Sequence, residues 1–165
     1  MPNIIPYDVT AALQYSEEFA LKRNPKFFDF TNYGGNCTNF ISQCVYAGAK
    51  VMNYKKTFGW YYISSYDRAP AWTSVQYFYN FMTTNKTRGP FAIPVPMENL
   101  VIGDIIQLKN PNNVYYHNLM VAVINGEPTP ENILINANDF DALHRPLDTY
   151  NYTGYRCLHI QGVYV

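Results

Sequence analysis

The sequence has little charge and no excess of either sign. It carries 12 Lys and Arg residues against 12 Asp and Glu residues, and charged residues make up only 15% of the chain. Its basic residues form no cluster beyond short pairs such as Lys55-Lys56. Proteins that bind nucleic acid or anionic lipid through charge carry a basic patch or stripe. We therefore expect no nucleic-acid partner and no polybasic membrane attachment.

Long hydrophobic runs are also missing. No apolar stretch approaches the roughly 20 residues that a transmembrane helix needs. The segment Met1 to Pro6 lacks the basic residues and following apolar stretch of a secretory signal peptide. We expect neither a membrane span nor a Sec-type signal.

Cysteine is scarce, and its number is odd. The three cysteines, Cys37, Cys44 and Cys157, lack the close pairing of a zinc site. This distribution argues against a disulfide framework and against a structural metal centre. We expect no metal and no other cofactor. Cys44 and Cys157 lie among apolar residues and are predicted to be core residues.

The chain is rich in apolar and aromatic residues. Apolar residues account for 48% of its 165 residues and aromatic residues for 17%, which suffices for a single domain with its own core over residues 1–165. Aromatic rings serve either a core or a surface that stacks on sugars and peptide planes. Tyr33, Trp60 and Trp72 are candidate substrate contacts, with core packing as the alternative for both tryptophans.

Hydrophobic periodicity predicts helices first and strands second. Apolar residues recur at helical spacing after Asp8, Cys37 and Ser74, and β-like segments separated by turn residues follow. The predicted helices span residues 8–23, 37–48 and 74–83, and the predicted strands span residues 104–109, 117–124, 133–138 and 155–165. Helices followed by an antiparallel sheet indicate an α+β fold.

The most informative segment is Gly34 to Gln43, with the sequence GGNCTNFISQ. It places Cys37 between a diglycine turn and the start of a helix. Unpaired backbone N–H groups at a helix start carry positive potential. This potential lowers the pKa of a cysteine and can hold the oxyanion of an attacked carbonyl. Cys37 is therefore predicted to be a catalytic nucleophile, with Asn36 and Thr38 beside the oxyanion.

His117 is the predicted general base. It stands at the start of an apolar, strand-like run, and an imidazole can carry a proton from the thiol to the leaving group. A third residue should orient the ring. Period two puts Asn136 and Asn138 on one face of the next strand, where either could accept the ring N–H. Asp139 and Asp141, in the turn that follows, are the alternatives.

These residues resemble the putative amidase domain family, whose pattern is close to GGDCTNFxSQ followed by a tryptophan, a GD pair and HS. The match consists of GGNCTNFISQ, Trp72, Gly103-Asp104 and His117, and it extends over almost the whole chain. That family is placed with the papain-like NlpC-type and CHAP-type cell-wall hydrolases. The resemblance implies a papain-like fold, in which a helix carrying the nucleophile Cys37 packs on a small antiparallel sheet carrying the base.

The resemblance also favours Asn138 as the third residue. The family has a second histidine ahead of a PL pair, and counting back from Pro146-Leu147 puts Asn138 at its position. An amide oxygen there could still orient His117, as in a Cys-His-Asn site. The sequence departs from the family pattern at this point. It departs again at Asn36, which replaces an aspartate, and at Asn118, which replaces a serine.

The expected function is a cysteine-dependent amide hydrolase that works through a thioester intermediate. The resemblance implies bacterial peptidoglycan or a peptide as the partner, cut between sugar and stem peptide or within the peptide. Without a Sec signal, the chain is expected to act at the cell wall after another route of release, as a phage endolysin does, or as part of a larger protein. Two alternatives stay open: an acyl transferase of the same fold, and a non-catalytic module that binds glycan or peptide.

Overall fold

The computed structural model describes residues 1–165, with all the α-helices in the first half of the chain and most strands in the second. The helices are α1 (Val9–Phe19), α2 (Cys37–Ala49), α3 (Pro70–Thr73) and α4 (Val75–Thr84). The strands are β1 (Ile4–Ile5), β2 (Tyr62–Ser64), β3 (Asp67–Arg68), β4 (Gly89–Val95), β5 (Ile105–Lys109), β6 (Tyr115–Ile124), β7 (Ile133–Ala137), β8 (Ala142–Pro146) and β9 (Gly154–Tyr164). Two short 3-10 helices are η1 (Met97–Asn99) and η2 (Leu147–Thr149). The predicted α+β class is confirmed.

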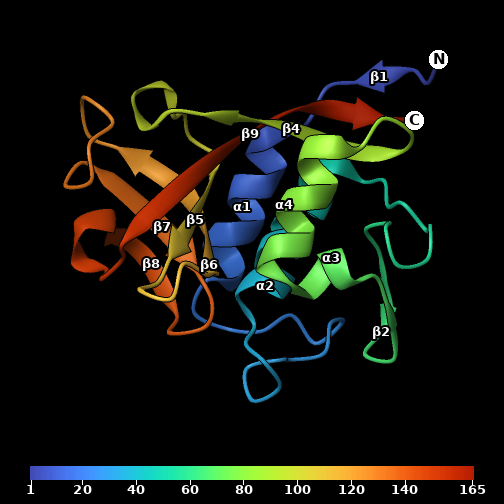
Figure 1. Ribbon diagram of the computed structural model, residues 1–165, viewed down its shortest axis with the longest axis horizontal. Helices are drawn as coiled ribbons and strands as arrows, with labels where there is room; N and C mark the ends of the chain where they lie inside the picture. The colour runs from blue at the N-terminus through green and yellow to red at the C-terminus, as the bar shows by residue number, and fades with distance from the viewer.

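One antiparallel sheet forms the scaffold, in the order β1-β9-β5-β6-β7-β8, and β4 also pairs with β9. The long strand β9 belongs to this sheet, and its last residues lie near the two ends of the chain, as Figure 1 shows. Ile4 pairs with Tyr164, so the two termini lie together. A separate hairpin consists of β2 and β3. None of the helices has the length and apolar character that crossing a membrane requires.

The first helix, α1, begins where the sequence predicts but ends earlier. Asp8 caps it, because its carboxylate accepts a hydrogen bond of 3.0 Å from an N–H of the first turn. The sequence predicts a helix to about Arg23, whereas α1 ends at Phe19. The carbonyls of Phe19 and Ala20 accept hydrogen bonds from the side-chain amide of Asn138. A tertiary contact thus satisfies these carbonyls, and the chain leaves the helix well before the next proline.

The second helix, α2, begins at Cys37 as predicted and passes through its predicted stop. Gly48 lies inside the helix, and the left-handed cap is Lys50, with φ of 59°. Gly48 serves a close approach instead, because a Cβ there would meet the ring of Tyr7 at 2.5 Å and the carbonyl of Asp8 at 2.6 Å. The missing side chain therefore lets the segment before α1 pack against α2.

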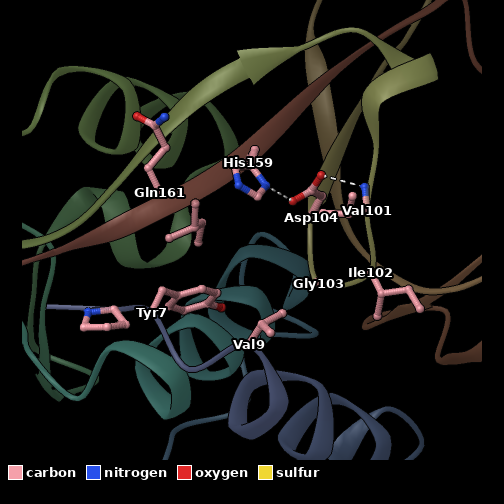
Figure 2. Close-up of a pocket in the computed structure, with 10 residues that line it drawn as sticks. Tyr7, Val9, Val101, Ile102, Gly103, Asp104, His159 and Gln161 are labelled. Carbon is pink, nitrogen blue, oxygen red and sulfur yellow. Dashed lines mark hydrogen bonds and ion pairs between the residues drawn. The ribbon is translucent and has the colours of Figure 1, made fainter.

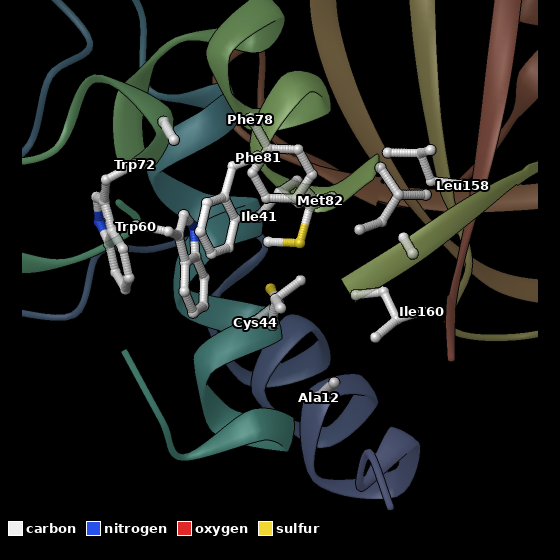
Figure 3. Close-up of a cluster of buried hydrophobic side chains, with 14 of the residues drawn as sticks. Ala12, Ile41, Cys44, Trp60, Trp72, Phe78, Phe81, Met82, Leu158 and Ile160 are labelled. Atoms are coloured by element: carbon white, nitrogen blue, oxygen red, sulfur yellow. The ribbon is translucent and has the colours of Figure 1, made fainter. Parts of the chain in front are cut away.

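Two apolar clusters, one on each face of the sheet, hold the elements together. The first lies between the helices and the sheet and includes Trp60 and Trp72 (Figure 3). The second covers the opposite face, where residues of η1 and η2 pack on the sheet. Cys44 belongs to the first cluster and Cys157 to the second. The predicted core positions of these two cysteines are confirmed, and all three cysteines, Cys37 included, are free thiols.

Sequence patterns predict β5, β6, β7 and β9 close to their observed bounds but miss β4 and β8, as well as the short strands β1, β2 and β3. Strand β4 contains Pro90 and Pro94, and proline occurs in sheets mainly on edge strands. β4 pairs only with β9, so its other edge is free and tolerates both prolines. Strand β8 is short and half-exposed, which leaves its alternation too weak to recognise.

Candidate active site

Cys37 is the first residue of α2 and follows a turn formed by Gly34 and Gly35. Both glycines have positive φ, 96° and 103°, a conformation that residues with side chains rarely adopt. All three residues line one cavity. Cys37 is 8% exposed, so the prediction that it heads a buried helix is confirmed.

The Cys37 thiol is closely surrounded. Its Sγ lies 3.8 Å from the carbonyl oxygen of Tyr116 and 3.8 Å from the hydroxyl of Thr38, which itself accepts a 2.9 Å hydrogen bond from Asn118 Nδ2. Burial raises the pKa of the thiol, while hydrogen bonds from the Asn118 backbone and from Thr38 lower it and the charge of Asp139 raises it. The expectation of a lowered pKa is therefore corrected. The loss of solvation outweighs the hydrogen bonds, and the resting thiol is neutral at pH 7.

The first turn of α2 contains backbone N–H groups that are available as hydrogen-bond donors. The first N–H groups of a helix have no intrahelical acceptor. Asn36 precedes the helix, yet its side chain makes no capping hydrogen bond. The N–H groups beside Cys37 therefore stay free of a cap, which is what an oxyanion site at this helix start requires.

Asn36 and Asn138, two departures from the family pattern, contact each other. Asn36 Nδ2 donates to Asn138 Oδ1 over 3.2 Å, and both residues are buried. Asn36 Oδ1 accepts from the backbone N–H of Phe30 and from Asn39 Nδ2, at 2.9 Å each. Asn138 Nδ2 donates to the carbonyl of Ala20 over 2.7 Å. Both side chains thus tie the start of α2 to the loop before it and to the end of α1.

His117 lies in β6 and lines the same cavity as Cys37. It is 6% exposed, and its Nε2 is buried without a hydrogen-bond partner. Burial lowers the pKa of His117 to about 4; the Asp139 carboxylate acts in the opposite direction and Arg145 in the same direction as burial. The imidazole is therefore neutral at pH 7 and able to accept a proton.

The side chains of β6 alternate between the two faces of the sheet. Met120 packs in the cluster on the helix side, whereas Leu119 and Val121 pack in the other cluster. His117 lies two positions before Leu119 and therefore shares its face. The imidazole therefore lies on the face turned away from the helices.

Asn136 and Asn138 lie on the opposite face from His117. Asn136 pairs with Met120 and donates to the hydroxyl of Ser16 in α1 over 3.0 Å. Asn138, two residues further on, also bonds to the end of α1. Neither amide forms a hydrogen bond with His117, so the orienting contact predicted for Asn138 is absent. Period two correctly placed both asparagines on one face, but the register makes it the face toward the helices.

Asp139 is the acidic residue that shares the cavity with His117. It lines the cavity with Cys37 and His117, and its charge raises the pKa of the imidazole. Asp141, the other carboxylate considered from the sequence, forms an ion pair with Arg23 at 2.9 Å instead.

The cavity has a volume of about 290 Å³. The diglycine turn and the start of α2 form one wall, β6 forms another, and the segment from the end of β7 to η2 forms the third. Sequence patterns single out Cys37 and His117 in this cavity but miss four further residues that line it, namely Tyr116, Phe140, Arg145 and Tyr150. Three of these belong to the turn and short elements after β7, which carry no recognisable period.

Residues 6–160 match the family described as "Putative amidase domain". The chain belongs to this family. It is 32% identical over 142 residues to the "Uncharacterized protein YhbB" of Bacillus subtilis (strain 168), an alignment that covers 84% of the chain and 43% of that protein. The chain thus spans less than half the length of this relative. No solved structure matches it. The cavity with Cys37 and His117 lies within the matched residues, and the family description indicates amide hydrolysis.

The predicted substrate contacts of this amidase domain divide into two groups. Trp60 and Trp72 are 0% exposed and donate their indole N–H groups to Ser42 and Asn39, at 3.0 Å each. They fill the core behind α2 and cannot touch a substrate, so the prediction of substrate contact is wrong for both. Tyr33 is 71% exposed beside the diglycine turn, and its contact with substrate stays a prediction.

The amidase domain has a second cavity, of about 300 Å³, with a different histidine and acid (Figure 2). His159 Nδ1 and Asp104 Oδ1 lie 2.7 Å apart, and Asp104 Oδ2 accepts a 2.9 Å hydrogen bond from the N–H of Val101. No cysteine or serine lines this cavity. Asp104, the acid of the GD pair, therefore closes the turn before β5, and the cavity lacks a nucleophile.

Proposed function

We propose that the chain is a cysteine amide hydrolase with Cys37 as nucleophile and His117 as general base. The observation that carries the proposal is their shared cavity, whose wall includes both a thiol at a helix start and a neutral imidazole. Uncapped N–H groups lie beside the thiol, and the Asp139 carboxylate acts on the imidazole. The amidase family supplies the class of reaction.

Both groups react from their neutral forms. His117 takes the thiol proton as the sulfur of Cys37 attacks the amide carbon, and N–H groups at the start of α2 hold the oxyanion. Asp139 stabilises the imidazolium that forms. His117 then gives this proton to the leaving amine, the C–N bond breaks, and a thioester remains. Water, deprotonated by His117, attacks the thioester, releases the carboxylic acid and restores the thiol.

We propose further that residues 1–165 form one papain-like domain. The helix that begins with Cys37 packs on an antiparallel sheet whose strand β6 carries His117, and this arrangement supports the proposal. In it, Asp139 takes the part of the third residue. Asn138 instead positions Asn36, and through it the start of the helix.

The proposed substrate is bacterial peptidoglycan, cut either between sugar and stem peptide or within the peptide. The resemblance of GGNCTNFISQ and His117 to cell-wall hydrolases supports this choice. The domain would act at the cell wall, on its own or as part of a longer protein. The relative of about twice its length fits the second case.

Digestion of purified peptidoglycan tests the proposal, with wild type beside Cys37→Ala and Cys44→Ala. Cys44 is a matched control, because it lies about two turns further along the same helix and is 0% exposed in the core. We expect soluble fragments from wild type and Cys44→Ala and none from Cys37→Ala, with all three shown to be folded by thermal melting. Masses and new termini identify the bond. Fragments from Cys37→Ala would contradict the cysteine mechanism, and no fragments from any of them would contradict the substrate.

A further inference from the structure

Arg145, in β8, places a positive charge on the wall of the cavity that holds Cys37 and His117. Its guanidinium lies over the ring of Tyr150, 3.7 Å from the centroid. Its Nε donates to the hydroxyl of Thr149 over 2.8 Å, and its Nη2 donates to the Thr149 carbonyl over 2.9 Å. Two hydrogen bonds and an aromatic face therefore hold the guanidinium in one orientation.

These contacts leave part of the guanidinium unused. A guanidinium has five N–H donors in a fixed fork, and the bonds to Thr149 use only those on Nε and Nη2. Arg145 forms no ion pair, because the ion pairs of the structure involve Arg23, His144 and His159. Asp139 lines the same cavity without pairing to Arg145. A half-buried cation with free donors and no carboxylate partner is a binding group for an anion.

We propose that Arg145 binds a carboxylate of the substrate, next to the amide that Cys37 attacks. This inference rests on the proposed function, since it assigns a specificity residue to the same site. The planar fork of an arginine matches the two oxygens of a carboxylate. Asp139 and Arg145 then divide the cavity between them: the negative charge serves the imidazole, and the positive charge receives the substrate. The substrate class is an amide flanked by an acidic side chain or by the carboxylate end of a peptide.

A purely structural role for Arg145 would also explain its hydrogen bonds, because they connect β8 to η2. Two variants separate the roles. Arg145→Gln loses both the charge and the fork that bonds to Thr149, whereas Arg145→Lys loses the fork but keeps the charge. Arg88→Gln is the matched control, because Arg88 is exposed and its side chain makes no hydrogen bond or ion pair.

The test compares the alkylation of Cys37 by iodoacetate and by iodoacetamide, two reagents of similar size that differ in charge. In both, the sulfur displaces iodide, so effects on thiol ionisation cancel in the ratio of the two rate constants. We expect this ratio to fall about tenfold in Arg145→Gln at low ionic strength, because a charge-assisted contact is lost. It should stay within about threefold of wild type in Arg145→Lys and match it in Arg88→Gln. An unchanged ratio in folded Arg145→Gln would overturn the proposal. The mass of the peptide containing Cys37 follows the reaction.

This readout needs no amide hydrolysis, so the inference and the proposed function fail separately. A Cys37 that is alkylated with the expected ratios but cuts no peptidoglycan would contradict the substrate and support Arg145. If Cys37 reacted with neither reagent, calorimetry on the Cys37→Ala protein decides, with N-acetyl-alanyl-glutamate and its diamide as probes. The acid should bind about tenfold more tightly than the diamide, and adding Arg145→Gln should remove the difference. Equal binding of the two probes would overturn the inference.

Discussion

Two cavities of similar size each hold a histidine and an acid, and they differ in whether the histidine has a hydrogen-bond partner. His159 is bonded to Asp104 over 2.7 Å, in a cavity without a nucleophile. His117 has a buried Nε2 without a partner, in the cavity that contains Cys37. Buried polar atoms are nearly always hydrogen-bonded, so an exception calls for an explanation. Here the histidine without a hydrogen-bond partner at Nε2 is the one that shares a cavity with a thiol.

The cysteines of α2 show the same contrast. Cys37 and Cys44 both have a raised pKa because of burial. Cys44 is enclosed by the core, whereas Cys37 opens to a cavity beside hydrogen-bond donors of Thr38 and Asn118. Burial alone therefore does not distinguish the core residue Cys44 from Cys37. The surrounding polar groups do.

Replacing each histidine in turn is the most sensitive test of the difference between the two cavities. His117→Ala should lower kcat/KM for amide cleavage by about 10³-fold or more, because general base catalysis is lost. His159→Ala should change it by less than about twofold, since its cavity holds no nucleophile. Release of the amine product measures both. Similar losses in the two variants would show that the cavities do not differ as described.

Glutamine variants of the two histidines should differ in how their stability depends on pH between pH 6.5 and pH 4. The pKa of His117 falls from 6.5 to about 4 on folding, so in this window the unfolded chain binds the additional proton. Stability therefore falls as the pH falls, by up to about 3 kcal/mol from this residue. Urea unfolding across the window should show this loss in wild type and in His159→Gln and a smaller one in His117→Gln. Parallel curves for all three proteins would contradict the burial of a neutral His117.

Asp139 and Asp141 allow the two carboxylates of one turn to be compared. Asp139→Asn should lower kcat by roughly 10- to 100-fold, because the imidazolium formed on His117 loses its counter-charge. It should also move the acid limb of the kcat/KM profile to lower pH, since the Asp139 charge raises the pKa of His117. Asp141→Asn breaks only the ion pair with Arg23 and should leave both unchanged. A pH-rate series on the three proteins measures the difference.

The smallest effect concerns the bond between Asn36 and Asn138. Asn36→Asp should cost about 2 kcal/mol of unfolding free energy, because it buries a carboxylate without a cation and removes a donor. Combining it with Asn138→His restores an acid and a histidine at these positions and should recover about 1 kcal/mol beyond the sum of the single changes. A double-mutant cycle by urea unfolding measures this coupling. Strict additivity would show that the two residues do not interact.

Local sequence rules located Cys37 and His117. A diglycine turn before an amphipathic segment predicts a helix that starts at Cys37, and an apolar run predicts the strand that carries His117. Both predictions are confirmed, because capping, turn chemistry and periodicity act within a few residues. The same rules placed Asn136 and Asn138 on a common face, which is also how they lie.

The partner of His117 could not be found by these rules. Which face of β7 lies beside the imidazole depends on the pairing of β6 with β7, and that register involves both strands at once. Trp60 and Trp72 were misjudged for a related reason: nothing local separates an exposed indole from one that fills the space behind a helix. Arg145 was missed because it lies in a strand with no clear pattern.

The sequence by itself thus determined that the main helices precede most of the sheet, that a helix starts at Cys37, and that a strand carries His117. Only the tertiary structure decided that Asp139 shares the cavity with the imidazole while Asn138 bonds to the end of α1, that thiol and imidazole are both neutral at rest, and that the tryptophans belong to the core. The physical reason is that burial and strand register arise between segments far apart in the chain. Desolvation sets the pKa values of Cys37 and His117, and it exists only once those segments have packed.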